Sequence, residues 1–193
     1  MRELNEIDIL NGVKQIVRDL TISKIDKDIF TFDPINSKDY RRWRFLSYQK
    51  RKKHINTIFE LGGMLTGSKV LSKSYIDGRK ILERRKTVRS DWDFIVTEEN
   101  VYKITSNVDF KQHKHVLSHR MIATDSYGHG GQSIDLIIIK DLPLCHKVGE
   151  FLYVDPLYII NQKVNLVFQK VKGYEKHEED LQEFYWKFNY LVR

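Results

Sequence analysis

The chain contains little cysteine and proline, and it has no long apolar run. Among its 193 residues are one cysteine, Cys145, and three prolines. A single cysteine excludes an internal disulfide, which is typical of proteins in a reducing compartment. No run of about 18 apolar residues is present, so we expect no membrane span, and the mixed charges at the start of the chain do not form a secretion signal. The sequence therefore predicts a cytoplasmic protein with no membrane partner.

The size and composition fit one globular domain, with room for a small helical addition. Hydrophobic residues make up 41% of the chain and aromatic residues 12%, which excludes disordered and fibrous classes of protein. A chain of 193 residues is long enough to bury a substantial core. With three prolines and ten glycines, the sequence has little material for long flexible linkers.

Positive charge gathers in two segments and accounts for the net charge of +7. Residues 40–54 contain seven Lys or Arg and no acid, and residues 79–89 contain six against the single acid Glu83. Such segments attract nucleotides or nucleic acid, or they form an ordinary solvated surface. Trp43 and Tyr48 lie within the first segment and are either base-stacking residues or core anchors.

The spacing of apolar residues predicts helices at both ends of the chain. Residues 3–20 and 37–61 have helical periodicity, and Gly62-Gly63 is a typical end for the second of these helices. Residues 156–191 are predicted to be helical as well, with a break near Gly173. The middle of the chain has a different period.

Short apolar runs in the middle of the chain predict strands. Residues 93–96, 132–139 and 152–154 fit buried strands, and 116–127 fits a strand joined to 132–139 by a glycine-rich turn at 128–131. The order helix, sheet, helix predicts an α+β fold, with a mixed sheet flanked by helices and a helical region at the C-terminal end. We place a catalytic domain at residues 1–155 and a helical region packed on it at 156–193.

Two carboxylates at the start of a predicted strand indicate a cation site. Asp91 and Asp93 are two positions apart, so in an extended strand both side chains point to one side. Two close carboxylates repel unless a cation lies between them, and Mg²⁺ takes hard oxygen ligands together with substrate phosphates. An Asp-x-Asp pair also occurs often by chance.

A third carboxylate, Asp135, interrupts the strongly apolar strand 132–139. An unpaired charge in such a strand would cost several kcal/mol, unless the residue faces solvent near a sheet edge. If the two strands are neighbours, Asp135 joins Asp91 and Asp93 in a cluster that holds two Mg²⁺ or Mn²⁺ ions. The combination of a Gly-Ser pair, an acid pair and a later single acid favours this interpretation over chance.

These residues resemble the nucleotidyltransferase superfold, which includes DNA polymerase beta and the aminoglycoside nucleotidyltransferases. The motif of that superfold is a Gly-Ser or Gly-Gly turn, a strand with paired acids, and a third acid on a later strand. Here Gly67 and Ser68 match the turn, Asp91 and Asp93 the pair, and Asp135 the third acid. The resemblance implies that the Gly67-Ser68 turn holds a nucleoside triphosphate and that the acids bind two Mg²⁺.

Within that superfold, the chain is most similar to the abortive-infection nucleotidyltransferase toxins of bacterial toxin–antitoxin systems. Residues 66–75, TGSKVLSKSY, resemble the glycine-rich segment of these toxins, and residues 89–94, RSDWDF, resemble their acid motif. The resemblance places Lys69, Arg89 and Ser90 at the nucleotide as well. The gap between the two motifs is longer than in the family, and its basic segment is either a phosphate-contacting loop or an insertion.

The helical tail extends the resemblance. Lys163 and Asp180 occupy places where the toxins have an active-site lysine and aspartate, so the resemblance implies a catalytic role for both. The alternatives from the residues alone are a surface lysine and a solvated helical face, since Asp180 lies in the acidic run 175–183.

Together these observations predict a Mg²⁺-dependent enzyme that transfers a nucleoside monophosphate from an NTP to an acceptor hydroxyl. RNA, and tRNA in particular, is the favoured acceptor because of the resemblance and the basic segments, and a protein hydroxyl or a small molecule is the alternative. The resemblance makes an antitoxin protein a candidate partner. The alternative is a catalytically silent protein of the same fold that binds nucleic acid or a protein partner.

Overall fold

A computed structural model describes most of the chain. The described residues are 5–26, 52–83, 91–107, 110–114, 119–123 and 134–192. No helix among them is long and apolar enough to span a membrane.

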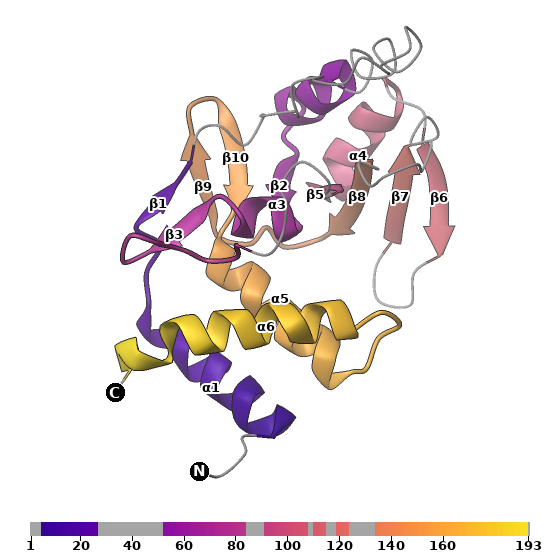
Figure 1. The fold of residues 1–193 in the computed structure, drawn as a ribbon. Helices are drawn as coiled ribbons and strands as arrows, with labels where there is room; N and C mark the ends of the chain where they lie inside the picture. The colour runs from indigo at the N-terminus through magenta and orange to yellow at the C-terminus, as the bar shows by residue number, and fades with distance from the viewer. Residues whose placement is uncertain are drawn as a thin grey trace, which may run out of the picture.

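The larger sheet is mixed and has seven strands (Figure 1). Two of its pairings are parallel, β5 with β8 and β10 with β2, and the others are antiparallel. In spatial order the strands are β6 (Phe110–Lys114), β7 (His119–Ala123), β8 (Ile134–Ile139), β5 (Trp92–Thr97), β2 (Met64–Thr66), β10 (Phe151–Val154) and β9 (Cys145–Val148).

A smaller antiparallel sheet contains the first residues of the basic segment 79–89. Its strands, in order, are β1 (Lys24–Ile25), β3 (Ser74–Ile76) and β4 (Arg79–Lys80). The β3–β4 turn has positive φ angles at Asp77 (48°) and Gly78 (71°). The beginning of the 79–89 segment is therefore a strand of a hairpin.

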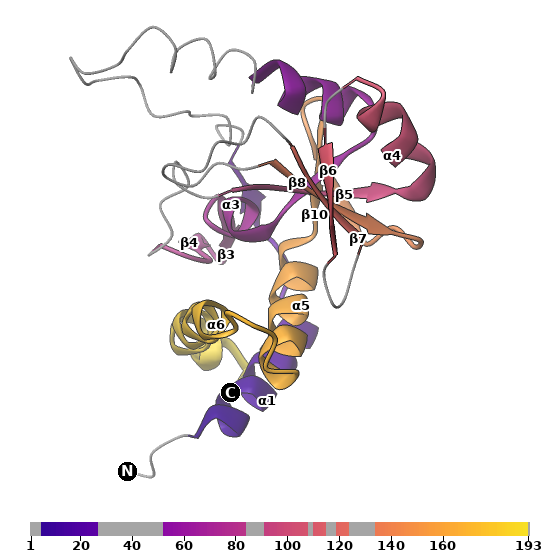
Figure 2. The same ribbon diagram turned by 90° about the vertical axis from the view of Figure 1, so that its right-hand side faces the viewer.

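Three helices from the two ends of the chain form one unit beyond the larger sheet (Figures 1 and 2). They are α1 (Glu6–Asp19), α5 (Pro156–Phe168) and α6 (Glu175–Phe188), which continues into the 3-10 helix η3 (Asn189–Val192). Helix α1 packs on both α5 and α6. The predicted helical region at 156–193 thus receives a third helix from the start of the chain.

The helix starts follow from local capping. Asn5 caps α1, because its side chain accepts the Asp8 N–H while the Asp8 carboxylate accepts the Asn5 N–H. Asp155 caps α5, and its Oδ1 accepts the N–H groups of Leu157 and Tyr158 at 2.8 and 3.1 Å. Pro156 then occupies the first turn, where its missing N–H has no effect.

One face of the larger sheet is covered by the helix at 52–60. The Phe59 ring lies 5.0 Å from that of Phe94 on β5 and 6.3 Å from that of Tyr153 on β10, centroid to centroid. Side chains alternate along a strand, so Phe94 and Trp92 lie on this face and Asp93 points to the opposite one. Two further helices, α3 (Gly67–Leu71) and α4 (Glu98–Thr105), follow β2 and β5 directly.

The predicted helices are found where the structure describes them. The helix predicted at 3–20 is α1, and the one at 156–191 is divided into α5 and α6 by a turn that includes Gly173 (φ 80°). The helix predicted at 37–61 ends before Gly62 (φ 86°) as expected. Its predicted start lies outside the described residues.

The predicted strands also correspond to observed ones. The strands predicted at 93–96 and 152–154 lie within β5 and β10, and the strand predicted at 132–139 contains β8. Strand β7 lies within the predicted strand 116–127 and pairs with β8. The glycine-rich turn at 128–131 lies outside the described residues. The α+β class is confirmed, although the sequence did not predict β2, β6, β9 or the small sheet. These strands are too short or too polar to show a clear period.

The Tyr153 hydroxyl gives a first prediction. Tyr153 is fully buried and its hydroxyl makes no hydrogen bond in the described part of the chain. Removing a buried hydroxyl without a partner relieves its desolvation cost, so Tyr153→Phe is expected to raise the free energy of unfolding by about 1 kcal/mol at pH 8. Urea denaturation measures this change, and a destabilised variant would contradict the burial of an unsatisfied hydroxyl.

The same residue predicts part of the alkaline behaviour. Burial raises the pKa of Tyr153 to about 12, whereas an unfolded tyrosine titrates near 10. Above pH 10 the unfolded chain therefore loses a proton that the folded chain still holds, and stability falls as the pH rises toward 12. We expect a smaller fall in Tyr153→Phe than in the wild type over this interval.

Candidate functional site

The connection between β2 and α3 is shaped by Gly67. Gly67 has φ 74°, in the left-handed region that glycine adopts without strain. A Cβ added at this position would overlap the Asp93 carboxylate and lie 3.2 Å from its Cγ. Position 67 therefore requires glycine for two reasons, the backbone angle and the direct contact with Asp93.

Asp93 and Asp135 are in register on two neighbouring strands. Strands β5 and β8 run parallel, with Asp93 opposite Asp135. Residues paired in this way point to the same face, on strands about 4.8 Å apart. Asp135 is only 2% exposed and Asp93 is half-buried. The structure thus brings together the second acid of the predicted pair and the later single acid.

Asp91 lies immediately before β5 and is half-buried. Among the residues that the structure describes, no group of three or more His, Cys, Asp or Glu is arranged to hold a metal ion. Two adjacent carboxylates suit a different kind of site, because Mg²⁺ is commonly bound by one or two carboxylates together with substrate phosphates and water. The carboxylate oxygens of Asp93 and Asp135 fit a Mg²⁺ ion whose other ligands are substrate phosphates and water. Asp91 lies two positions before Asp93 in the sequence.

The two residues after Gly67 differ in their surroundings. Ser68 is half-buried in the first turn of α3, where its carbonyl accepts the Ser72 N–H at 3.0 Å. Lys69 is 2% exposed, and its Nζ lies 4.5 Å from the ring centroid of Trp92. The Lys69 amine is therefore buried against an aromatic ring, and its predicted contact with a triphosphate stays a prediction.

Lys163 and Asp180 form a buried ion pair between α5 and α6. Lys163 Nζ lies 3.0 Å from Asp180 Oδ2 and 3.2 Å from His177 Nδ1. Lys163 is 5% exposed and Asp180 is fully buried. The alternatives of a surface lysine and a solvated acidic face are therefore wrong. The two predicted site residues are brought together, in a place where a charge is costly unless it is paired.

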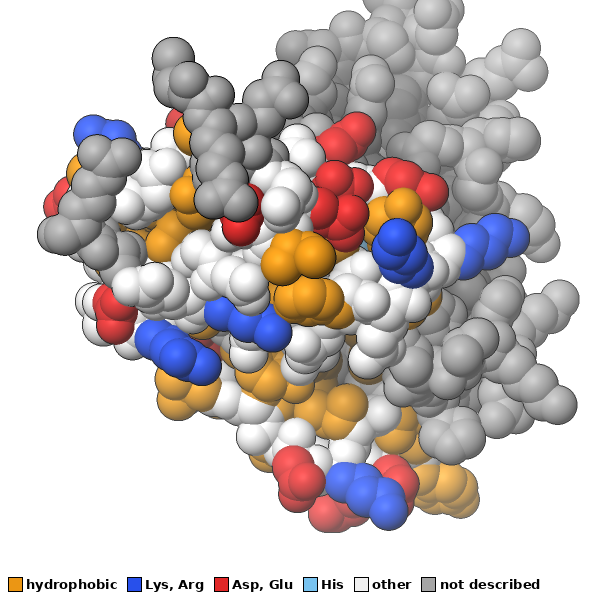
Figure 3. Space-filling view, turned by 90° about the horizontal axis from the view of Figure 1, so that it is seen from below, with side chains coloured by type: hydrophobic (Ala, Val, Ile, Leu, Met, Phe, Trp, Pro, Cys, Tyr) orange, Lys and Arg blue, Asp and Glu red, His pale blue; other side chains and the backbone are white. Residues whose placement is uncertain are grey.

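Several predicted residues are outside the described part of the chain. Arg89 and Ser90 lie there, as do residues 40–51 of one basic segment and 84–89 of the other. The described remainder includes Lys52 and Lys53, which are exposed at the start of the helix at 52–60. Seen from below, the described surface mixes acidic, basic and hydrophobic side chains (Figure 3).

The sequence did not predict the hydrogen bonds by which α6 holds β4 and the residues that follow it. Lys187 Nζ donates to the Lys80 carbonyl at 3.0 Å and lies 3.1 Å from Glu183 Oε1. The same Glu183 oxygen accepts the Glu83 N–H at 2.6 Å. The contacts of Lys187 with Lys80 and of Glu183 with Glu83 join residues 107 and 100 positions apart, so no local pattern could reveal them. They hold the chain in place at Glu83, eight residues before Asp91 in the sequence.

A second missed contact holds the other edge of the sheet. His146 Nε2 on β9 lies 2.6 Å from Asp155 Oδ2, while the other oxygen of Asp155 caps α5. One carboxylate therefore ties an edge strand to a helix start. The sequence shows the cap, since Asp155 precedes Pro156, but it does not show the histidine.

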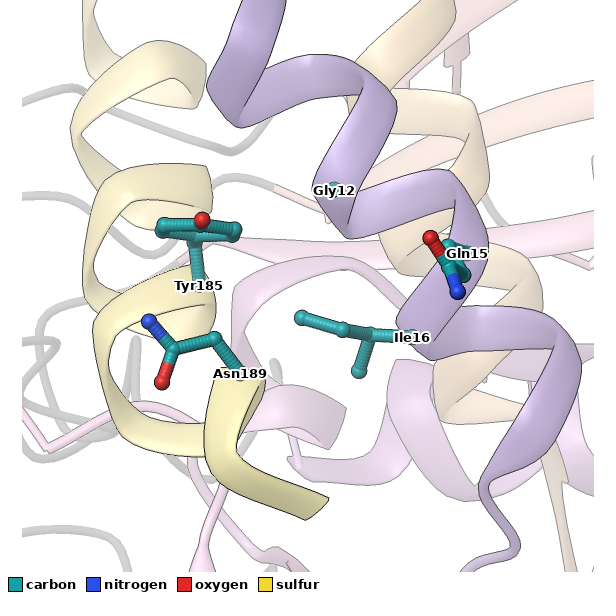
Figure 4. A pocket seen from close by; sticks show the side chains of 5 residues that line it. All are labelled: Gly12, Gln15, Ile16, Tyr185 and Asn189. Atoms are coloured by element: carbon teal, nitrogen blue, oxygen red, sulfur yellow. The ribbon is translucent and has the colours of Figure 1, made fainter. Parts of the chain in front are cut away.

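A small cavity opens between α1 and α6 (Figure 4). Its volume of about 110 Å³ is below the roughly 300–1,000 Å³ of ordinary small-molecule sites. None of the predicted site residues lines this cavity, so it is not an alternative to the sheet face with Asp93 and Asp135 as a nucleotide site. It is lined by Gly12, Gln15, Ile16, Tyr185 and Asn189.

No family model matches the chain, and neither a curated protein nor a solved structure matches it.

Proposed function

We propose that the chain is a nucleotidyltransferase that moves a nucleoside monophosphate from an NTP to an acceptor hydroxyl with the help of Mg²⁺ or Mn²⁺. One observation carries the proposal: Asp93 and Asp135 are in register on adjacent strands, and the Gly67 turn lies directly against Asp93. A glycine turn beside paired carboxylates is the arrangement that the resemblance implies. A cation bound by two carboxylates that share a face relieves their mutual repulsion.

The proposal gives each of these residues a role. Asp93 and Asp135 would hold the cation, and Asp91 lies two positions before Asp93 in the sequence. A cation held there would supply neutralisation of phosphate charge and activation of the attacking oxygen. Asp135 also accepts the proton of the acceptor hydroxyl, and the backbone and hydroxyl of Gly67-Ser68 hold the triphosphate, as the resemblance implies. Lys163 and Asp180 belong to the proposal through the resemblance.

The proposed acceptor is RNA, with tRNA favoured, and the proposed partner is an antitoxin protein. Both come from the resemblance to the toxin family. The charge of the chain supports an RNA acceptor, because +7 in net charge favours binding to phosphate backbones. Exposed Lys52 and Lys53 contribute to this charge in the described part of the chain.

The test is transfer of label from NTPs to RNA. The full chain is incubated with Mg²⁺, total RNA and each of the four NTPs, labelled on the α-phosphate. We expect label in RNA with the wild type and none above background with Asp93→Ala, because the substitution removes half of the carboxylate pair. Asp141→Ala is the matched control, since Asp141 is exposed just after β8, and it should transfer as the wild type does.

The same experiment distinguishes the alternative function. Retention of RNA without label transfer, equal in the wild type and Asp93→Ala, would show a binding protein that has the fold but not the activity. Equal transfer by Asp93→Ala and the wild type would contradict the proposed site.

A further inference from the structure

A third oxygen-bearing side chain lies in the same row as the two acids. Thr66 is the last residue of β2 and is opposite Asp93 in the antiparallel pairing of β2 with β5. Asp93 is in turn opposite Asp135. Paired residues share a face, with Cβ atoms about 4.5–5.5 Å apart in an antiparallel pair. Thr66, Asp93 and Asp135 therefore stand side by side across three adjacent strands.

The Asp93 carboxylate lies against Gly67, the residue that follows Thr66. A Cβ at Gly67 would meet Asp93 at Cβ (3.3 Å) and Cγ (3.2 Å) as well as at the carboxylate oxygen. The side chain thus extends along the end of β2 instead of away from it. A ligand bound by the Asp93 carboxylate would therefore lie beside Thr66. Thr66 is 6% exposed, and its side chain makes no capping hydrogen bond to α3.

The hydroxyl supplies what the carboxylates lack. Ionised carboxylates only accept hydrogen bonds and repel phosphate, whereas a threonine hydroxyl also donates. Building on the proposed function, we propose that Thr66 is a nucleotide-binding residue whose hydroxyl donates a hydrogen bond to a phosphate oxygen of the cation-bound triphosphate. The acid pair then binds the cation, and Thr66 binds the phosphate that shares it. Thr66 precedes the two residues of the matched turn, so the motif alone does not indicate it.

Two variants separate the hydroxyl from the shape of the side chain. Thr66→Val keeps the branched shape and loses the hydroxyl, while Thr66→Ser keeps the hydroxyl. The dissociation constants of ATP, GTP, CTP and UTP are measured by calorimetry on the full chain with Mg²⁺. For the nucleotide that binds, we expect Thr66→Val to raise the constant at least about ten-fold, as for a lost hydrogen bond to a charged group. Thr66→Ser should stay within about two-fold.

Thermal unfolding of both variants accompanies the titrations, so that a folding defect is visible as such. If Thr66→Val binds as the wild type does, or if the serine variant is weakened as much as the valine variant, the assignment of Thr66 is wrong and the proposed function stands. If the wild type binds none of the four nucleotides, the proposed function fails together with this inference. Asp93→Ala provides the reference for a chain that has lost the cation site.

Discussion

Replacing Gly67 with alanine is expected to reduce label transfer to RNA to the level of Asp93→Ala. Alanine at φ 74° costs roughly 1–2 kcal/mol, because its Cβ approaches the following carbonyl oxygen. The added Cβ would also occupy the place of the Asp93 carboxylate. The carboxylate must then rotate away from the end of β2, which breaks its arrangement with Asp135. The transfer assay measures the loss of activity, and urea denaturation measures the loss of stability.

Gly78→Ala is the matched control for this variant. Gly78 has φ 71°, and a Cβ added there meets nothing within 4 Å. The variant therefore carries the same backbone penalty in the β3–β4 turn without touching the acids. We expect a similar loss of stability and unchanged transfer. Equal transfer by Gly67→Ala and Gly78→Ala would show that the contact between Gly67 and Asp93 does not matter for activity.

Lys163→Met is expected to lower the free energy of unfolding by about 3–5 kcal/mol, because it leaves the Asp180 carboxylate buried without its cation. The Lys163–Asp180 distance of 3.0 Å and the full burial of Asp180 make this a desolvated pair. A loss of this size is a large part of the roughly 5–15 kcal/mol that stabilises a typical domain. Urea denaturation gives the value, provided that the slope of the transition stays unchanged.

The control for this variant is an exposed pair of similar geometry. Lys103 Nζ lies 3.2 Å from Glu99 Oε1 on the surface of α4. Because water screens such pairs, Lys103→Met should change stability by less than about 1 kcal/mol. A loss as small in Lys163→Met would contradict the burial of the α5–α6 pair.

A double variant separates structure from catalysis. Replacing both members with apolar residues, Lys163→Met with Asp180→Leu, removes both buried charges and is expected to recover much of the lost stability. If the recovered protein transfers label as the wild type does, the pair only joins α5 to α6. If it folds but transfers nothing, Lys163 and Asp180 act in the reaction as the resemblance implies.

The acid pair shows what sequence can predict about such a site. Alternation along a strand predicts that residues two apart share a face, and a single acid in an apolar strand indicates a special position. The register of β5 with β8 depends on how the whole sheet assembles. From the sequence, we could say only that Asp93 and Asp135 would meet if their strands were neighbours. Asp91 lies just outside the strand, where alternation no longer decides its direction.

The ion pair of α5 and α6 shows the opposite case. Asp180 lies in an acidic run that predicts a solvated face, yet the packing of α6 on α5 buries it completely. Periodicity within one helix does not show which neighbour will cover it. The sequence predicted the Gly67-Ser68 turn, but it did not predict the short helix α3 that begins there.

The packing of α1 on α5 and α6 has a consequence for how the protein is made. On the ribosome, α1 emerges before the helices that cover its apolar side. At roughly 5–20 residues per second, translation leaves that side uncovered for on the order of ten seconds. During this interval the apolar side of α1 is open to chaperones and to other nascent chains. The packing of α1 can therefore be completed only after α6 has emerged.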